Sequence, residues 1–173
     1  MIIIGGDPGL TGALALLQPG HLLDVLDLPT CASGQETGRM QQWLDCDALR
    51  AALCTWSGKH AFAAESIHIA LERPIPMPSL NASTIAAQFD AFGVLRASLA
   101  RVGKVQTVAP ADWKRFYGLK KQGTGSKADS AVKAEACEIA RSLYPNAPLT
   151  LVKHHNRAEA VLIGHWLLRR EHG

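Results

Sequence analysis

The sequence predicts an α/β fold, built on a mixed sheet with helices on both of its faces. The chain opens with a short apolar run, residues 2–6, whose β-branched residues are typical of a strand buried on both faces. Two more strand-like runs follow within hairpin distance, and later strand-like runs alternate with helical patterns. In that succession, right-handed crossovers place the fourth and fifth strands parallel to the first.

The individual elements follow from local composition. Apolar, β-branched or alternating runs predict strands at residues 2–6, 13–17, 22–28, 66–71 and 105–108. Helical spacing of apolar residues and capping signals predict helices at 45–56, 81–101, 110–116, 126–143 and 157–170. We expect Asp45 or Asp47 to cap the first helix and Asn81 the second, and Ser126 with Asp129 to form a capping box. Residues 29–44, rich in Gly, Ser, Gln and Thr, are expected to form a loop.

Length and composition narrow the classes of protein. The chain has 173 residues, 47% of them hydrophobic and 19% charged, which favours a single folded domain over 1–173 and argues against intrinsic disorder. No run of about 18 apolar residues predicts a membrane span, and the first residues already read as a strand instead of a signal or transit peptide. The four cysteines form no C-x-x-C pair. We therefore expect a reduced, cytoplasmic protein with no membrane partner.

Charge is distributed unevenly along the chain. Residues 1–100 carry 5 Lys and Arg against 9 Asp and Glu, a balance of −4, whereas residues 101–173 carry 13 against 6, a balance of +7. The basic half is densest between Lys114 and Lys133. Such a cluster is either a solvated helix surface or a surface that binds a polyanion, and charge alone favours the solvated surface.

Two carboxylates mark the ends of predicted neighbouring strands. Asp7 follows the first strand and Glu72 follows the fourth, and the carboxyl ends of these parallel strands meet where the strand order reverses. Each acid has an ordinary interpretation, because Asp-Pro-Gly is a common turn and a glutamate at a strand end usually meets water. Together they form an arrangement that a hard divalent cation stabilises, since neighbouring carboxylates repel one another. A metal site and two unrelated acids are equally good interpretations of this pair.

A third acid, Glu159, lies near the start of the last predicted helix. If Asn156 is the N-cap, Glu159 occupies the third helical position, where it completes a capping box. Alternatively, His155 and Glu159 lie one turn apart and point an imidazole and a carboxylate into one site. His154 and His155 are also compatible with a solvent-exposed loop.

Five motifs resemble one known family. The opening IIGGDPG, with TGA at 11–13, resembles the start of RuvC-type Holliday-junction resolvases of the RNase H-like superfamily. Four further segments are similar to the branch that contains the chloroplast resolvase of nucleoid segregation (monokaryotic chloroplast) and its bacterial and phage relatives. They are LERP at 71–74, PADWK at 110–114, SKADS at 126–130 and RAEA at 157–160. The resemblance spans nearly the whole chain, with the motifs in the same order.

The resemblance implies a fold and a site. The fold is an RNase H-like five-stranded sheet in the order 3-2-1-4-5, with strand 2 antiparallel. The catalytic metal site is implied to comprise Asp7, Glu72, His155 and Glu159, with two Mg²⁺ ions for which Mn²⁺ substitutes, and Lys127 is implied near the scissile phosphate. Two departures stand out. Asn156 occupies the slot three residues before Glu159 where RuvC has a ligand, and Ile75 and Met77 stand where RuvC tends to have a base-wedging aromatic residue.

The resemblance also implies an activity and partners. The protein is expected to be a structure-specific endonuclease that introduces paired symmetric nicks into four-way DNA, as a nucleoid-associated homodimer. The apolar stripe of Phe89, Phe92 and Leu95 is either the dimer surface or core. The DNA-binding side chains are expected to be Arg73, Lys114, Lys120, Lys121 and Lys127.

Two other functions fit parts of the sequence. Residues 7–12 also resemble the first phosphate loop of actin-like sugar kinases and related chaperone ATPases, but those proteins need a second such domain, for which 173 residues leave no room. A catalytically silent RNase H-like module that binds DNA or a partner is the other alternative. The presence of all four implied site residues argues against it.

Overall fold

The computed structural model describes residues 1–33, 41–60, 67–77, 80–120, 125–151 and 154–172. Its strands are β1 (Ile2–Asp7), β2 (Ala13–Gln18), β3 (His21–Asp27), β4 (Thr30–Ser33), β5 (Gln41–Leu44), β6 (Ile67–Glu72) and β7 (Lys104–Val108). Its helices are α1 (Cys46–His60), α2 (Ala82–Leu99), α3 (Pro110–Phe116), α4 (Ser126–Leu143) and α5 (His155–His172). Among the described residues, no helix is long and apolar enough to cross a membrane.

The main sheet has five strands in the order β3-β2-β1-β6-β7. β2 is antiparallel to both β1 and β3, whereas β1, β6 and β7 run parallel. This is the predicted order 3-2-1-4-5, with β6 and β7 as the fourth and fifth strands. In the β1–β6 register Gly6 is aligned with Leu71, so the next residues, Asp7 and Glu72, end their strands side by side.

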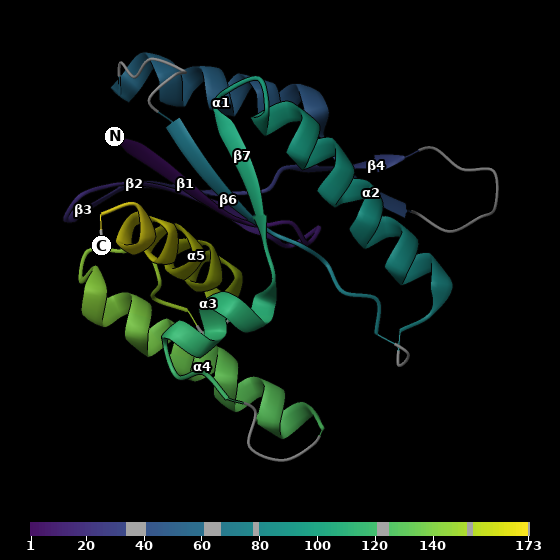
Figure 1. Cartoon of the computed structure of the whole chain (residues 1–173). Coiled ribbons are helices and arrows are strands. Elements are labelled where there is room, and N and C mark those ends of the chain that lie inside the picture. The colour runs from purple at the N-terminus through teal and green to yellow at the C-terminus, as the bar shows by residue number, and fades with distance from the viewer. Residues whose placement is uncertain (34–40, 61–66, 78–79, 121–124, 152–153, 173) are drawn as a thin grey trace.

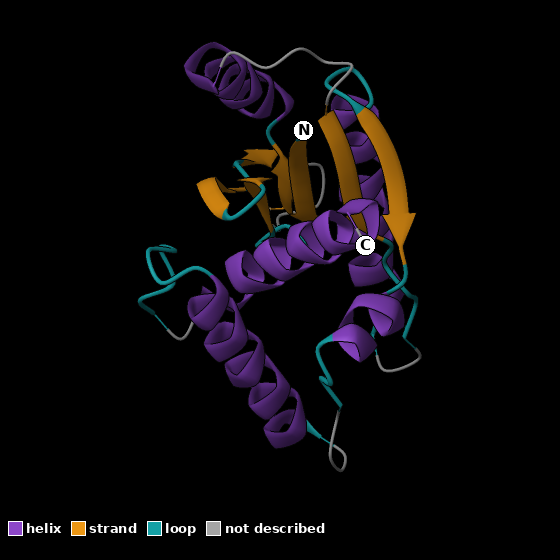
Figure 2. Ribbon diagram, turned by 60° about the vertical axis from the view of Figure 1, so that its left-hand side comes forward, coloured by secondary structure: helices purple, strands orange, loops and turns teal. Residues whose placement is uncertain are grey.

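Helices cover both faces of this sheet, as predicted (Figure 1). α1 and α2 lie on one face, and α5 lies across the other with α3 and α4 beyond it (Figure 2). Successive strand residues point to opposite faces. Ile3 therefore joins the core formed with α5, and Ile4 joins the core formed with α1 and α2, both with no exposed surface. The apolar opening of the chain is thus a strand buried on both faces.

The predicted loop at 29–44 is wrong for its described residues. β4 and β5 pair as an antiparallel two-stranded sheet, with Cys31 opposite Trp43, and residues 34–40 lie outside the described residues. Buried Leu28, two residues before β4, and buried Leu44, the last residue of β5, anchor this ribbon on the core of α1 and α2. A polar composition concealed the strands because the ribbon is exposed beyond those two anchors.

Four of the five predicted helices begin within one residue of their predicted starts, whereas the start of α5 and the capping box of α4 were predicted incorrectly. The Oδ1 atoms of Asp45 and Asn81 accept from the amides of Ala48 and Thr84 at 2.9 and 2.8 Å, which confirms both caps. α4 has Gly125 at its N-cap with a positive φ of 91° and no side-chain cap, so Ser126 does not cap a box. α5 begins at His155, two residues before the predicted start.

Candidate metal centre

Three acids meet at one edge of the sheet. Asp7 ends β1 and Glu72 ends β6, and Glu159 comes from the second turn of α5, which packs across β1. Each contributes a carboxylate oxygen, and the three oxygens lie within 4.8 Å of one another. Glu159 is buried, at 9% exposure, and the other two are half-buried. The strand ends thus bring together the two acids that the sequence analysis paired, and α5 adds the third.

A tight turn holds Asp7. The amide of Gly12 donates to the carbonyl of Gly9 at 2.7 Å, and the amide of Gly9 donates to Oδ1 of Asp7 at 3.3 Å. A Cβ at Gly12 would stand 2.1 Å from the carbonyl oxygen of Asp7, so only glycine fits there. The Asp-Pro-Gly segment is therefore a turn that also orients a carboxylate into the cluster.

α3 provides the contacts of the other two acids. Its Trp113 has no exposed surface, and its Nε1 donates to Oε2 of Glu72 at 2.5 Å. The next residue, Lys114, places Nζ 3.7 Å from Oε1 of Glu159 and 5.0 Å from the centre of the Trp113 ring. α3 therefore supplies both a hydrogen-bond donor and a cation to the acid cluster.

The start of α5 is fixed by contacts with distant parts of the chain. Arg157 forms a two-pronged pair with Asp27, with Nε at 2.6 Å from Oδ1 and Nη2 at 2.5 Å from Oδ2. Asn156 Nδ2 donates to the carbonyl and to Oγ1 of Thr11, at 2.5 and 2.9 Å. Asn156 is thus within the helix and bound to the turn after β1, so the capping-box interpretation of Glu159 is wrong.

Burial and crowding shift the ionisation of the acids. Burial, together with the carboxylates of Glu159 and Glu72, raises the pKa of Asp7 to about 7. Burial likewise raises the pKa of Glu72 to about 7, against the opposing charge of Lys114. Burial and neighbouring carboxylates thus make the charged forms of Asp7 and Glu72 costly, and a bound cation would lower that cost.

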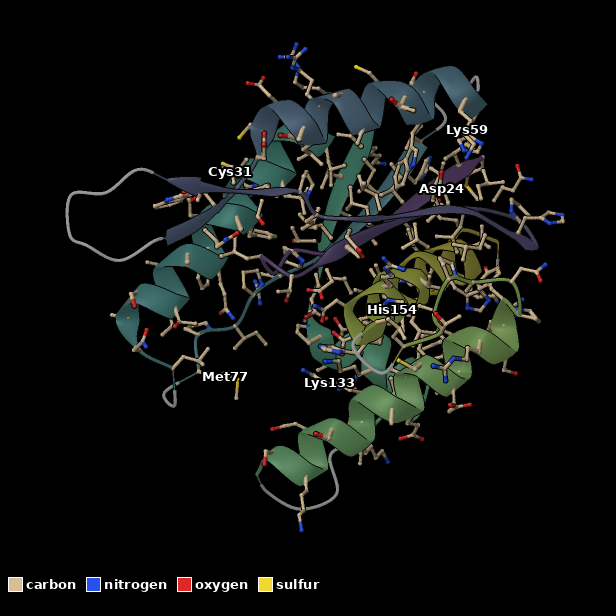
Figure 3. All side chains as sticks on the ribbon, turned by 180° about the vertical axis from the view of Figure 1, so that it is seen from behind. Asp24, Cys31, Lys59, Met77, Lys133 and His154 are labelled. Carbon is tan, nitrogen blue, oxygen red and sulfur yellow. The ribbon has the colours of Figure 1, made fainter. Side chains whose placement is uncertain are left out.

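The predicted site residues do not all meet. His155 lies at the first position of α5, and its Nε2 is 3.1 Å from Nζ of Lys133 in α4, outside the three-acid cluster. Figure 3 labels Lys133 on α4 and His154, the residue before α5, on the two segments that this contact joins. Lys127 is exposed in the first turn of α4. Of the other predicted DNA-binding residues, Arg73 and Lys120 are exposed, Lys114 is half-buried, and Lys121 lies outside the described residues.

Two contributions of α3 were missed. Trp113 was not singled out, because an indole in a short helix reads as core. Lys114 was assigned to DNA alone, although its ammonium lies beside Glu159. The available signal was the position of PADWK directly after β7, whose carboxyl end lies beside that of β6. A residue one turn into such a helix is well placed to reach the strand ends.

A cavity of about 430 Å³ opens beside the acids. Asp7, Glu72 and Lys114 form its polar end. Its other lining residues come from the turn after β1, the segment between β6 and α2, α2 itself and the start of α3, and they include Pro74, Ile75, Met77, Leu80 and Gln88. Ile75 and Met77 are half-exposed, at 50% and 53%, at the mouth of this cavity. The cavity is thus lined both by charged side chains of the site and by apolar side chains of the segment after β6.

The fold is RNase H-like, of the RuvC type, with the mixed five-stranded sheet and flanking helices described above. The solved structure of Thermus thermophilus RuvC in complex with a Holliday junction substrate matches over 99% of this chain and 96% of its own, at a TM-score of 0.61 and 16% identity. A second Thermus thermophilus RuvC structure covers 99% and 97%, at a TM-score of 0.49 and 16% identity. No protein-family model matches the sequence. No curated protein matches it either.

Proposed function

We propose that this protein is a metal-dependent endonuclease that resolves four-way (Holliday) DNA junctions by paired symmetric nicks. The observation that carries the proposal is the cluster of Asp7, Glu72 and Glu159 at the carboxyl ends of two parallel strands, with Lys114 beside it. The likeness of the fold to a RuvC bound to a Holliday junction substrate supports the choice of DNA substrate.

The acid cluster fits Mg²⁺ or Mn²⁺. Its donors are all carboxylate oxygens, which these hard cations prefer, and burial together with carboxylate repulsion raises the pKa values of Asp7 and Glu72. We propose that Asp7, Glu72 and Glu159 hold two such ions. When bound, the ions supply an activated water and stabilise the leaving oxygen of a phosphodiester.

Lys114 and His155 then have distinct roles. The Lys114 ammonium, 3.7 Å from Glu159, is placed to offset negative charge on the phosphate during cleavage. His155 places Nε2 3.1 Å from Nζ of Lys133, and an imidazole is the side chain that most often carries protons in catalysis. We propose that His155, which lies outside the three-acid cluster, acts as a proton carrier from the start of α5.

The basic side chains form a track for the DNA backbone. Three of them are exposed. Arg73 follows β6, Lys120 lies in the segment after α3, and Lys127 lies in the first turn of α4. Contacts of this kind release counterions from DNA, so affinity for a junction falls steeply as salt is raised. We propose that Lys127 contacts the phosphates near the junction from the first turn of α4.

A four-way junction needs two matched nicks, which a symmetric homodimer supplies. α2 offers the surface: Leu95 is buried, Phe92 is half-buried, and Phe89 is 39% exposed. The predicted stripe is thus partly core and partly surface. Phe89→Asp should convert a dimer to a monomer by light scattering, whereas Phe116→Asp, at a similarly exposed phenylalanine of α3, should not. A wild-type monomer at all concentrations would contradict this part of the proposal.

The test of the whole proposal is cleavage of a synthetic four-way junction. With Mg²⁺ or Mn²⁺, wild-type protein should place paired nicks at symmetric positions and leave a linear duplex of the same sequence intact. Asp7→Asn should still bind the junction but cut it at least about 10²–10³-fold more slowly. Equal cleavage of linear duplex, or no cleavage with either ion, would overturn the proposal, and binding without cleavage would instead identify a catalytically silent module.

A further inference from the structure

Trp113 links the two opposite charges of the site through a single buried side chain. Its Nε1 donates to Oε2 of Glu72 at 2.5 Å, and its ring face lies 5.0 Å from the ammonium of Lys114. We infer that Trp113 is a positioning residue that fixes the Glu72 carboxylate for a divalent cation. This inference rests on the function proposed above.

The indole is suited to this role. A buried N–H requires an acceptor, because leaving it unpaired is destabilising. Here Oε2 of Glu72 is that acceptor, so the plane of the carboxylate is set and Oε1 is left to face a cation. Donors of this type, behind a metal-binding group, hold it in the geometry that the ion requires. The same ring attracts the Lys114 ammonium and thereby keeps it near Glu159.

The position of Trp113 is itself fixed. Its ring meets that of Tyr117 edge to face, with centroids 6.5 Å apart. The Tyr117 hydroxyl donates to the carbonyl of Leu162 in α5 at 3.0 Å and lies 2.7 Å from Nδ1 of His165. α3 is therefore pinned to the helix that carries Glu159, so the indole and the third acid are held in one rigid unit.

The experiment compares two buried tryptophans. Trp113→Phe keeps an aromatic ring but removes the N–H, and Trp166→Phe makes the same change in α5, where the ring packs on Arg170. Titration with Mn²⁺, followed by electron paramagnetic resonance, should show affinity about 10–100-fold weaker for Trp113→Phe. Trp166→Phe should match wild type within about twofold, as expected for a substitution that leaves the metal ligands and their donors in place. Equal affinities of wild type and Trp113→Phe would overturn the inference.

A double-variant cycle separates positioning from packing. In a Glu72→Ala background the indole has no carboxylate to hold, so adding Trp113→Phe should not weaken Mn²⁺ binding further. An equal loss in both backgrounds would show that Trp113 acts through packing alone and would overturn the inference.

The hydrogen bond between Trp113 and Glu72 can also be followed by nuclear magnetic resonance, independently of Mn²⁺ affinity. The indole N–H resonance of Trp113 in a ¹⁵N-correlated spectrum should shift on Glu72→Ala and again when Mg²⁺ is added to wild type, while that of Trp166 stays in place. An unmoved Trp113 resonance would overturn the inference. Wild-type protein that binds neither ion would overturn it together with the proposed function, whereas Mn²⁺ binding without junction cleavage would count against the proposed activity alone.

Discussion

The backbone of Gly5 in β1 lies directly against Gly164 in α5. A Cβ on Gly5 would stand 2.1 Å from the carbonyl oxygen of Ala160 and 2.3 Å from the amide nitrogen of Gly164. The helix therefore crosses the strand at a separation that a side chain at position 5 does not allow. Because Glu159 precedes this crossing by about one turn and Asp7 follows Gly5 by two residues, the contact sets the two acids beside one another.

This contact predicts unequal costs for two small substitutions. At Gly5 a new methyl group meets backbone, whereas at Gly164 its nearest neighbour is the flexible end of Leu17, at 2.4 Å. Gly5→Ala should therefore lower the free energy of unfolding by about 3 kcal/mol or more, and Gly164→Ala by about 1–2 kcal/mol. Urea unfolding of both variants measures the difference. A loss of only about 1 kcal/mol or less for Gly5→Ala would contradict the close crossing.

Much of the fold was predictable from local pattern. The five strands of the main sheet have distinct apolar runs, and the parallel placement of β6 and β7 follows from the handedness of crossovers. The start of α5 was not predictable in this way, because Asn156 has the composition of a cap. Its side chain instead donates to Thr11, 145 positions earlier in the chain, and no local rule contains that contact.

The candidate site also contains residues that were predictable from the sequence and residues that were not. Asp7 and Glu72 were predictable because strand ends determine where they lie. The lysine beside the acids was not, because Lys114 and Lys127 carry the same charge and only the packing of α3 against the strand ends distinguishes them. The distance along the sequence does not predict which lysine contacts Glu159.

The raised pKa values predict a pH-dependent stability. In the folded chain Asp7 and Glu72 hold protons up to about pH 7, which the unfolded chain releases near pH 4. Their contribution to stability is thus complete below about pH 4 and is lost as pH rises through about 7. In EDTA the urea concentration at the unfolding midpoint should be higher at pH 5 than at pH 8, and Asp7→Asn should reduce this difference. A midpoint that rises with pH in both proteins would contradict the assignment.

The same pKa values predict a pH-dependent affinity for Mn²⁺. This affinity should rise between pH 6 and 8, since protons compete for the same oxygens.

Lys114 and Lys127 should fail in different ways when neutralised. Lys114 lies beside Glu159, so Lys114→Met should slow nicking about 10²-fold or more on saturating junction. Lys127 is exposed, so Lys127→Met should chiefly weaken junction binding and reduce the slope of log affinity against log salt by about 1. Single-turnover cleavage and binding titrations at several salt concentrations separate the two. If Lys127→Met slowed nicking as much as Lys114→Met does, the positive charge that assists cleavage would come from Lys127 in α4, which contradicts the prediction.

His155 and Glu159, one helical turn apart on α5, should also have separable effects. Glu159 belongs to the three-acid cluster, so Glu159→Gln should weaken Mn²⁺ binding about 10-fold or more. His155 faces Lys133, so His155→Ala should keep Mn²⁺ affinity within about twofold and slow nicking about 10²-fold, the scale of a lost proton carrier. Lys133→Met, which removes the donor to the imidazole, is the matched control and should retain Mn²⁺ affinity. Mn²⁺ binding weakened as strongly by His155→Ala as by Glu159→Gln would instead place the imidazole among the metal ligands, as the family resemblance implies.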